Sequence, residues 1–426
     1  MDTAIIILFL GLLIFLGNIL NRVFVLTKIP DLLCLIFIGL LIGPVLGLAT
    51  PSSFGIVGPI FTTVTLAIIL FEGGLHLTVD TIKNAFAGTI ALTITSFLVT
   101  FVVVAGILYY AQVLTILPAL MLGAIVGGTS SAIVIPLSSN MHLRKDGVAL
   151  LSLESAITDV LCILILLTLI DAFQLGSFNV PTIIGKLISA FVMALILGVI
   201  GGIVWSAVYH RLGEMKSIFL TPAFLFVIYG VVDTLGYSGP IAALAFGITL
   251  GNLDSFSIAA HFPKWDTIRQ VELTPTETAF LSQLVQLLKT FFFIYVGLSI
   301  EFNSNESFIL GAIITLILFV VRIGIVYATV PRTIPIWDAS VMAIMIPKGL
   351  AAAVLAAIPL QYGVEGGAFI ETTTYAIILI SIVICSVLVL LLERTPVRKL
   401  YAWFFGSFGK PGGPEDTPPG AIQKSS

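Results

Sequence analysis

Apolar stretches long enough to cross a lipid bilayer recur along almost the whole chain. A transmembrane helix needs about 20 consecutive, mostly apolar residues, and such segments follow one another between residues 3 and 393. Of the 426 residues, 58% are hydrophobic and only 10% are charged, whereas a soluble domain carries about 25% charged residues. This pattern excludes a soluble protein and predicts an all-α, polytopic membrane protein.

Glycine and proline residues mark the breaks between these stretches, as at Gly43-Pro44 and Gly239-Pro240. Residues 1–400 are predicted to form the transmembrane domain, and the short tail over 401–426, which is rich in Pro, Gly and Ser, is expected to be disordered. Thirteen spans are predicted, at approximately 3–21, 31–48, 55–73, 84–111, 113–138, 147–171, 181–209, 217–233, 238–252, 279–299, 307–329, 336–361 and 370–393.

The basic residues that lie outside the spans are concentrated in alternate loops. Odd-numbered loops and the C-terminal tail contain nearly all of them. The exception on the even-numbered side is Lys186, which lies near the start of span seven, next to loop six. Cytoplasmic loops carry the excess of Lys and Arg, so this bias places the C-terminus in the cytoplasm and the N-terminus outside a plasma membrane. No basic residue precedes the first apolar stretch, which is therefore predicted to be a retained anchor and not a signal peptide.

Spans three and ten contain similar segments, 71–77 (Phe-Glu-Gly-Gly-Leu-His-Leu) and 294–300 (Ile-Tyr-Val-Gly-Leu-Ser-Ile). Glycines of span two also match glycines of span nine, Gly39 and Gly43 with Gly247 and Gly251. Spans that are seven apart have opposite orientations, so the pattern predicts two inverted six-helix repeats, which are typical of alternating-access transporters. A chance match between glycines of an apolar chain is the alternative.

Five ionisable residues within the predicted spans are the first candidates for a functional site: Glu72, Glu154, Asp159, Arg322 and Lys348. An ionisable group at membrane depth costs on the order of 3 kcal/mol or more. Such groups are therefore rare in transmembrane segments, and a functional role is the default hypothesis for each of them.

Span six presents two carboxylates on neighbouring helix faces. Ser155 and Asp159 are four residues apart and share one face, where a hydroxyl and a carboxylate are oxygen ligands suited to a hard cation. Glu154 and Thr158 share the adjacent face, and Arg322 in span eleven is the candidate partner that neutralises Glu154. Asp159 is accordingly predicted to bind a cation, with a purely structural contact between helices as the alternative.

Spans five and twelve are predicted to be interrupted helices. Span five contains the segment 127–131 (Gly-Gly-Thr-Ser-Ser) followed by Pro136, and span twelve contains the segment 347–349 (Pro-Lys-Gly). A break frees backbone carbonyls to bind a cation and exposes the dipoles of the half-helices. Lys348 is expected to offset the carbonyl ends at such a crossing. Close packing of helices by small residues is the other interpretation.

These residues together resemble the monovalent cation:proton antiporter superfamily, in particular its sodium/proton (NhaP-like) branch. The resemblance covers nearly all of residues 1–400. The matching segments are 29–33 (Ile-Pro-Asp-Leu-Leu) leading to Gly39 and Gly43-Pro44, 71–75 (Phe-Glu-Gly-Gly-Leu), Thr129, and Glu154-Ser155 followed by Thr158-Asp159.

The resemblance implies a homodimer in which a core of helices 4–6 and 11–13 moves against a dimerisation domain of helices 1–3 and 8–10. It implies that Asp159 binds the cation. It also implies that Ser155, the backbone at Thr129, and Glu72 are accessory ligands of the transported metal ion.

The resemblance further implies that Glu154 and Arg322 form a buried structural pair, and that Lys348 stands where the family usually has an arginine at the helix crossing. The residue before the key aspartate departs from the family pattern. Family members usually have Asn or Asp there, whereas this chain has Thr158. A threonine hydroxyl can hydrogen-bond unwound backbone but cannot carry a second negative charge, so Thr158 leaves ion selectivity and stoichiometry open.

Secondary active antiport is the function that the residues and the resemblance predict. Na⁺ and H⁺ would compete for Asp159, and electroneutral exchange is expected. Exchange of K⁺ for H⁺ is the alternative, because oxygen ligands alone do not choose between the two ions. A cation channel, a sensor and an intramembrane enzyme are the other classes, and the chain lacks the His-Glu-x-x-His motif of a zinc enzyme. Neither a cofactor nor a nucleic-acid partner is expected.

Overall fold

The computed structural model describes fifteen segments of the chain. They are residues 11–12, 15–17, 19–20, 31–50, 57–76, 87–130, 133–134, 137–138, 141, 143–174, 180–211, 217–253, 274–300, 305–395 and 397–409. Within these segments the regular structure is entirely helical, which confirms the predicted all-α class. Most of predicted span one, together with Ser131, Pro136 and residues 410–426 of the predicted tail, lies outside the described residues. Residues 401–404 of that tail are helical, so the expectation of disorder is wrong for this part.

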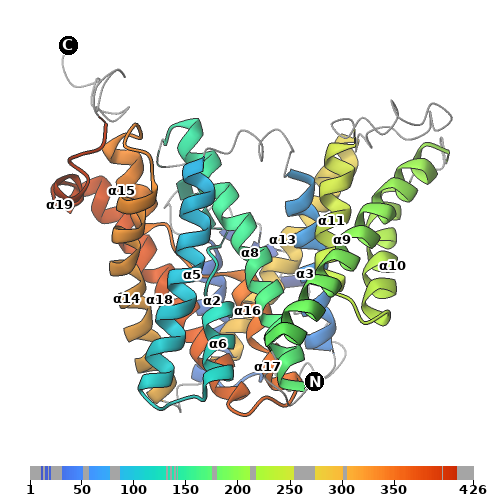
Figure 1. Cartoon of the computed structure of the whole chain (residues 1–426), viewed down its shortest axis with the longest axis horizontal. Helices are drawn as coiled ribbons and strands as arrows, with labels where there is room; N and C mark the ends of the chain where they lie inside the picture. Colours follow the sequence, from blue (N-terminus) through green and yellow to red (C-terminus); the bar gives the residue numbers. More distant parts are fainter. Residues whose placement is uncertain are drawn as a thin grey trace. The chain divides into compact units, whose positions relative to one another are not determined.

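The helices follow the apolar stretches of the sequence (Figure 1). Their bounds are α2 Asp31–Leu40, the π-helix η1 Leu41–Val45, α3 Val57–His76, α5 Ala87–Tyr110, α6 Ile116–Ile125, α8 Lys145–Gln174, α9 Val180–Arg211, α10 Leu220–Thr234, α11 Gly239–Asn252, α13 Pro275–Leu298, α14 Asn305–Thr329, α15 Ile336–Ile344, α16 Leu350–Ala356, α17 Ile358–Gln361, α18 Gly367–Arg394 and α19 Val397–Phe404.

Six of the described helices contain apolar segments long enough to cross a membrane: Thr89–Tyr110, Leu150–Gln174, Phe191–Arg211, Pro275–Leu298, Glu306–Thr329 and Gly367–Glu393. Shorter apolar helices accompany them, among them α6, α10 and α11. These lengths and compositions agree with a polytopic membrane protein. The count of thirteen spans and the inverted repeats stay predictions.

The chain forms two compact units. The first comprises Met1–Gly17, Pro51–Asn84 and Leu167–Phe292, and the second comprises Asn18–Thr50, Ala85–Leu166 and Phe293–Ser426. Helices α8 and α13 each contribute residues to both units. The predicted division of labour between a dimerisation domain and a moving core concerns function and stays a prediction.

In the first unit, α3, α9 and α10 pack against α11 (Figure 1). The rings of Phe71 on α3 and Phe246 on α11 stack in its core, with centroids 5.2 Å apart. The same two helices cross through glycine. A Cβ atom at Gly247 would meet the backbone oxygen of Phe71 and would lie 3.2 Å from Gly74 Cα. The two backbones therefore touch, as small residues at a membrane helix interface allow.

An equivalent crossing occurs in the second unit, between α2 and the end of α13. A Cβ atom at Gly39 would meet the backbone oxygen of Ile294 and would lie 3.0 Å from Gly297 Cα. In the sequence repeat, Gly39 corresponds to Gly247 and the segment 294–300 corresponds to 71–77. Corresponding residues thus make corresponding contacts in the two units, which supports the predicted repeat.

Replacing Gly247 with alanine is expected to destabilise the protein by about 1–3 kcal/mol, the usual cost of overpacking. The new methyl group would meet backbone atoms of α3, which cannot rotate away as a side chain can. The midpoint of thermal unfolding in detergent measures the effect. Gly230→Ala on α10 is the matched control, because a Cβ atom there has open space. Equal midpoints for the two variants would contradict a close α3–α11 crossing.

Candidate functional site

Two interrupted helices cross in the second unit. Helix α6 ends at Ile125 and is followed by non-helical residues up to Ser130. Helix α15 ends at Ile344, and α16 begins at Leu350 after five non-helical residues. The backbone N–H of Ser130 donates a hydrogen bond of 2.8 Å to the carbonyl of Pro347. The two unwound segments are therefore joined directly, at the breaks that glycine and proline predicted in spans five and twelve.

Lys348 lies at this crossing and is 2% exposed. Its Nζ donates a hydrogen bond of 2.8 Å to the carbonyl of Gly128, just beyond the C-terminal end of α6. Its backbone N–H donates one of 3.0 Å to Ser381 Oγ on α18. A helix C-terminus carries partial negative charge on its free carbonyls, so the ammonium group stabilises this end of α6. The backbone N–H of Lys348 connects the crossing to α18.

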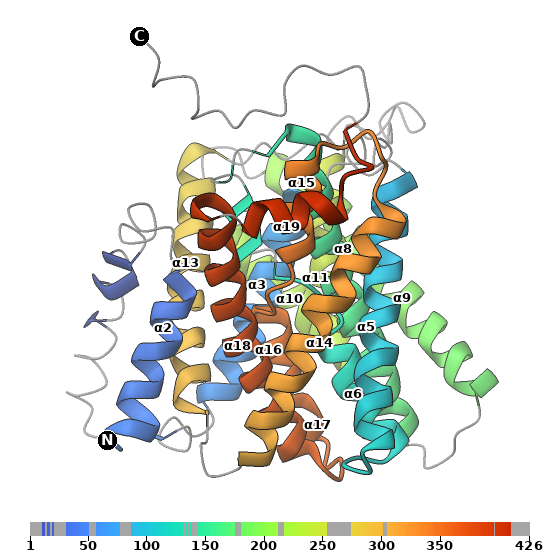
Figure 2. The ribbon, with the colours of Figure 1, turned by 90° about the vertical axis from the view of Figure 1, so that its left-hand side faces the viewer.

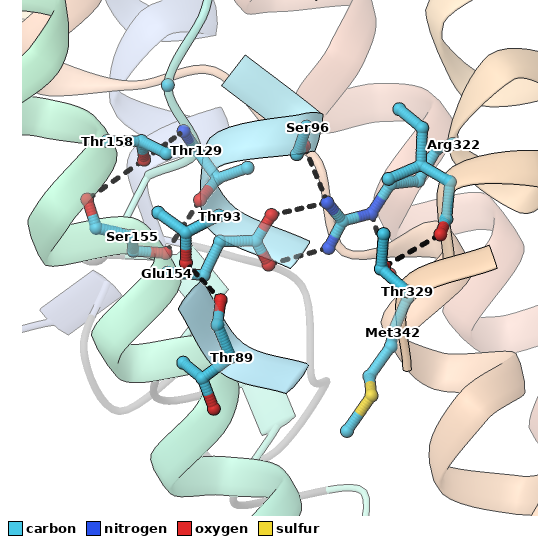
Figure 3. Close-up of polar contacts among 12 residues, drawn as sticks. Thr89, Thr93, Ser96, Thr129, Glu154, Ser155, Thr158, Arg322, Thr329 and Met342 are labelled. Atoms are coloured by element: carbon cyan, nitrogen blue, oxygen red, sulfur yellow. Dashed lines mark hydrogen bonds and ion pairs between the residues drawn. The ribbon is translucent and has the colours of Figure 1, made fainter. Parts of the chain in front are cut away.

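Arg322 on α14 connects four elements of the second unit (Figure 3). Its two terminal nitrogens form a forked ion pair with the Glu154 carboxylate on α8, and one of them also donates to Ser96 Oγ on α5 at 2.7 Å. Its Nε donates to the carbonyl of Met342, in the last turn of α15, at 3.2 Å. The guanidinium therefore neutralises Glu154 and also caps the C-terminal end of the second interrupted helix.

Hydroxyl groups from α8 and from the unwound segment after α6 are hydrogen-bonded together (Figure 3). Thr129 Oγ1 lies 2.8 Å from Ser155 Oγ. The Thr129 N–H donates to Thr158 Oγ1 at 3.3 Å, and that hydroxyl donates in turn to the Ser155 carbonyl at 3.1 Å. Thr158 thus holds the unwound backbone against α8, which is the role that a hydroxyl at this position was predicted to retain.

Asp159 follows Thr158 on α8 and lies beside the same unwound segment. A Cβ atom at Gly128 would be 3.5 Å from Asp159 Oδ1 and 2.9 Å from Cys162 Sγ, so only glycine lets the backbone approach this closely. The carbonyl of the same Gly128 accepts the hydrogen bond of the Lys348 ammonium. Glu154 is completely buried, whereas Asp159 is partly exposed. The two neighbouring carboxylates therefore have different environments, one neutralised by Arg322 and the other accessible.

Oxygen atoms of the kind that bind a monovalent cation gather at Asp159, Ser155 and Thr129. No group of three or more His, Cys, Asp and Glu side chains that suits a tightly held metal occurs in the described segments. Glu72, the remaining predicted ligand, is half-buried on α3 in the first unit. Its role as an accessory ligand stays a prediction.

The polar face of α5 was not predicted from the sequence. Thr89, Thr93, Ser96 and Thr100 are all buried, and Ser96 binds Arg322. Their spacing of four, three and four residues places them on one helix face, so the sequence contained this signal. The contact between Arg322 and Met342 had no such signal in the sequence, because Met342 contributes only its backbone carbonyl.

A second buried acid, Asp338 in the first turn of α15, was also missed although it falls inside predicted span twelve. It is 3% exposed, and its Oδ2 accepts a hydrogen bond of 3.2 Å from the N–H of Arg144, immediately before α8. The adjacent Trp337 donates from Nε1 to the carbonyl of Met141 at 3.0 Å. A carboxylate is favourable at a helix N-terminus, and these contacts tie the beginning of α15 to the beginning of α8.

Comparisons with known proteins match most of this chain. Residues 5–394 match the family described as "Sodium/hydrogen exchanger, transmembrane". The chain is 27% identical over 374 residues to "Probable Na(+)/H(+) antiporter 2" of Methanocaldococcus jannaschii, covering 83% of this chain and 84% of that protein. It is 28% identical over 195 residues to "K(+)/H(+) antiporter NhaP2" of a Shewanella species, covering 45% of this chain and 34% of that protein.

The fold is similar to that of a solved structure, the sodium proton antiporter MjNhaP1 from Methanocaldococcus jannaschii at pH 8. The TM-score is 0.71 at 22% sequence identity, and the match covers 91% of this chain and 100% of that one.

Proposed function

Since this chain belongs to the sodium/hydrogen exchanger family, we propose that it exchanges Na⁺ for H⁺ by alternating access, with Asp159 as the shared binding group. The family consists of membrane transporters and not of enzymes, and cation–proton antiport needs no cofactor because both ions are cargo. The observation that carries the proposal is the contrast between two carboxylates of α8. Glu154 is buried and paired with Arg322, while Asp159 is partly exposed. Asp159 is also one helical turn from Ser155, whose hydroxyl lies 2.8 Å from that of Thr129.

Competition between Na⁺ and H⁺ for Asp159 couples the movement of the two ions. A charged side chain at membrane depth is costly, so the empty, ionised site is the least stable state. Binding of either a proton or a monovalent cation neutralises the carboxylate. In this mechanism only a neutralised site moves between the two sides of the membrane. Release of one ion then has to precede binding of the other, and this sequence of events is exchange.

Na⁺ is the proposed cation, with K⁺ as the second candidate. The relative that covers 83% of this chain is named as a Na⁺/H⁺ antiporter, whereas the one named as a K⁺/H⁺ antiporter covers 45%. Oxygen ligands bind either ion, so the ligand set itself does not decide between them.

Transport by the purified protein in proteoliposomes tests the proposed function. We expect Na⁺ or Li⁺, added outside under an imposed pH gradient, to drive proton movement that a pH-sensitive dye inside the vesicles reports. Proton movement that occurs with K⁺ but not with Na⁺ or Li⁺ would replace Na⁺/H⁺ exchange by K⁺/H⁺ exchange as the proposed function. Cation flux that continues without proton movement would identify a channel.

Electroneutral exchange is expected, because Asp159 is the only carboxylate of the site that changes its charge in the cycle. Each loaded form, with one H⁺ or one Na⁺, then has the same net charge. The equilibrium ion distribution should not change when the membrane potential is moved from zero to about 100 mV, which is worth about 2.3 kcal/mol per net charge. A shift would contradict the one-carboxylate mechanism and would point first to Lys348 as a second proton carrier.

Thr158→Asp is the comparison variant for this experiment. It puts a second titratable group beside Asp159, so a shift with the membrane potential is expected in the variant even though the parent protein shows none. Thr158→Ser keeps the hydroxyl that accepts from the Thr129 N–H and should behave like the parent.

We propose a homodimer formed through predicted spans 1–3 and 8–10, with predicted spans 4–6 and 11–13 as the moving core. We also propose that Glu72 is an accessory ligand of the cation. The excess of Lys and Arg in alternate loops supports an external N-terminus and a cytoplasmic C-terminus in the plasma membrane.

A further inference from the structure

Helix α19 is held at the end of a membrane-crossing helix. Apolar α18 ends at Arg394, and α19 begins three residues later, at Val397. Figure 2 shows α19 lying crosswise to α14 and α18. Three residues of chain span at most about 10 Å, so α19 must lie near the membrane surface that α18 reaches.

One side of α19 and of the turn that follows it is fixed to the protein. Tyr401, Phe405 and Phe408 are buried. The Arg332 guanidinium lies 4.2 Å from the ring centroid of Tyr327 and 4.3 Å from that of Phe408, and the Gly409 N–H donates to the Arg332 carbonyl at 3.0 Å. These contacts hold α19 against the loop between α14 and α15, so the helix cannot turn its other side inward.

The opposite side of α19 is apolar and exposed. The side chains of Leu400, Trp403 and Phe404 are 56%, 76% and 43% exposed. Their spacing of three and four residues puts them on one face of the helix. Lys399 is exposed on the same helix, and Arg398 precedes it in the sequence. A face of this composition in water would be unfavourable, whereas Trp and Phe beside basic residues are typical of helices that lie in a membrane interface.

We propose that the Leu400–Trp403–Phe404 face of α19 is embedded in the boundary between headgroups and acyl chains of the leaflet that α18 reaches, and that Lys399 gives it a preference for anionic lipids. Basic residues next to an anionic surface contribute through charge, while the aromatic and aliphatic side chains contribute through burial of apolar area. The inference concerns α19 alone and stands whichever cation the protein transports.

Fluorescence quenching of Trp403 by brominated lipids tests this inference. The full-length protein is reconstituted into vesicles whose lipids carry bromine either near the headgroup or near the end of the acyl chain. The signal of Trp403 is the difference between the parent and Trp403→Phe, which keeps an aromatic ring and removes the indole. We expect this difference signal to be quenched more strongly by bromine near the headgroup than by bromine near the chain end.

Lipid charge is tested with the same signal. At equal total bromine, brominated phosphatidylglycerol should quench Trp403 more than brominated phosphatidylcholine, with an enrichment of about fivefold for one basic residue near the surface. Lys399→Gln should lower this preference without changing quenching by the neutral lipid. Lys289→Gln, which alters a lysine on α13 and not on α19, is the control and should leave the preference unchanged.

Two results would overturn the proposal. Quenching of Trp403 by aqueous iodide, with none by either brominated lipid, would show that the face is in water. Protection of Trp403 from both kinds of quencher would show that protein covers it, most directly a second copy of this chain. Either result can be read without any variant that disturbs folding, because the Trp403→Phe difference needs only a conservative substitution.

Discussion

Replacing Asp159 with asparagine is expected to reduce cation-driven proton exchange to the background of protein-free vesicles while the protein stays folded. Asparagine has nearly the shape of aspartate, and shape matters here because Oδ1 lies close to Gly128. It keeps an oxygen that can contact a cation but has no charge to neutralise and no proton to release. The variant should therefore fail in both halves of the cycle. Exchange in proteoliposomes and thermal unfolding in detergent provide the two measurements.

Asp171→Asn is the matched control for this prediction. Asp171 is on the same helix, twelve residues after Asp159, and is exposed. The control should retain exchange, which separates loss of the site from loss of any aspartate on α8. Cation-dependent proton movement that persists in Asp159→Asn at the parental rate would remove Asp159 from the mechanism.

Replacing Glu154 with alanine is expected to cost about 3–5 kcal/mol of stability, the usual penalty for breaking a buried ion pair. The variant would leave Arg322 charged at 1% exposure, with Ser96 and the Met342 carbonyl as its remaining partners. The loss should appear as a lower midpoint of thermal unfolding and as poor recovery from the membrane. Ser96→Ala removes one hydrogen bond of the same guanidinium and should cost less, about 1–3 kcal/mol.

The double variant Glu154→Ala with Arg322→Ala determines whether the two residues act as a pair. Removing both charges should cost less than the sum of the single effects. It should not restore the parental stability, however, because Arg322 also caps α15 through the Met342 carbonyl and the orphaned carbonyl remains. Simple additivity of the three changes in unfolding midpoint would argue against direct pairing.

Pairing of Glu154 with Arg322 was predictable from the sequence because few charges occur within the spans. A buried charge in an apolar chain requires a partner of opposite sign, and Arg322 was the obvious candidate. The breaks in α6 and α15 were predictable for a similar reason, since glycine and proline interrupt helices at positions where apolar pattern alone would continue them. The contacts of the backbone were not predictable, because every residue has the same carbonyl and N–H.

Asp338 illustrates a different limit. Its position inside predicted span twelve marked it as unusual, but its partner is the backbone N–H that precedes α8, and no side-chain pattern identifies such a partner. The hydroxyl face of α5 lies between these cases. Its spacing was visible, but hydroxyls in transmembrane helices often bond to their own backbone, as Thr93 does to the carbonyl of Thr89 at 2.7 Å. Only Ser96 reaches the ion pair.

The sequence by itself determined that this protein is an all-α membrane protein with few, specifically placed charges, because the cost of exposing polar groups to lipid acts on every residue and is visible in composition. It also paired Gly39 with Gly247 as matching positions of the predicted repeat, whereas the helix crossings at these two glycines were seen only in the structure. Lys348 was expected to offset carbonyl ends at the helix crossing, but tertiary structure alone decided that it binds the Gly128 carbonyl and that Arg322 caps the other interrupted helix at Met342. Those contacts depend on which backbone carbonyls come close to the two side chains in the fold. Because every residue has the same carbonyl, residue types do not show which one a distant side chain will bind.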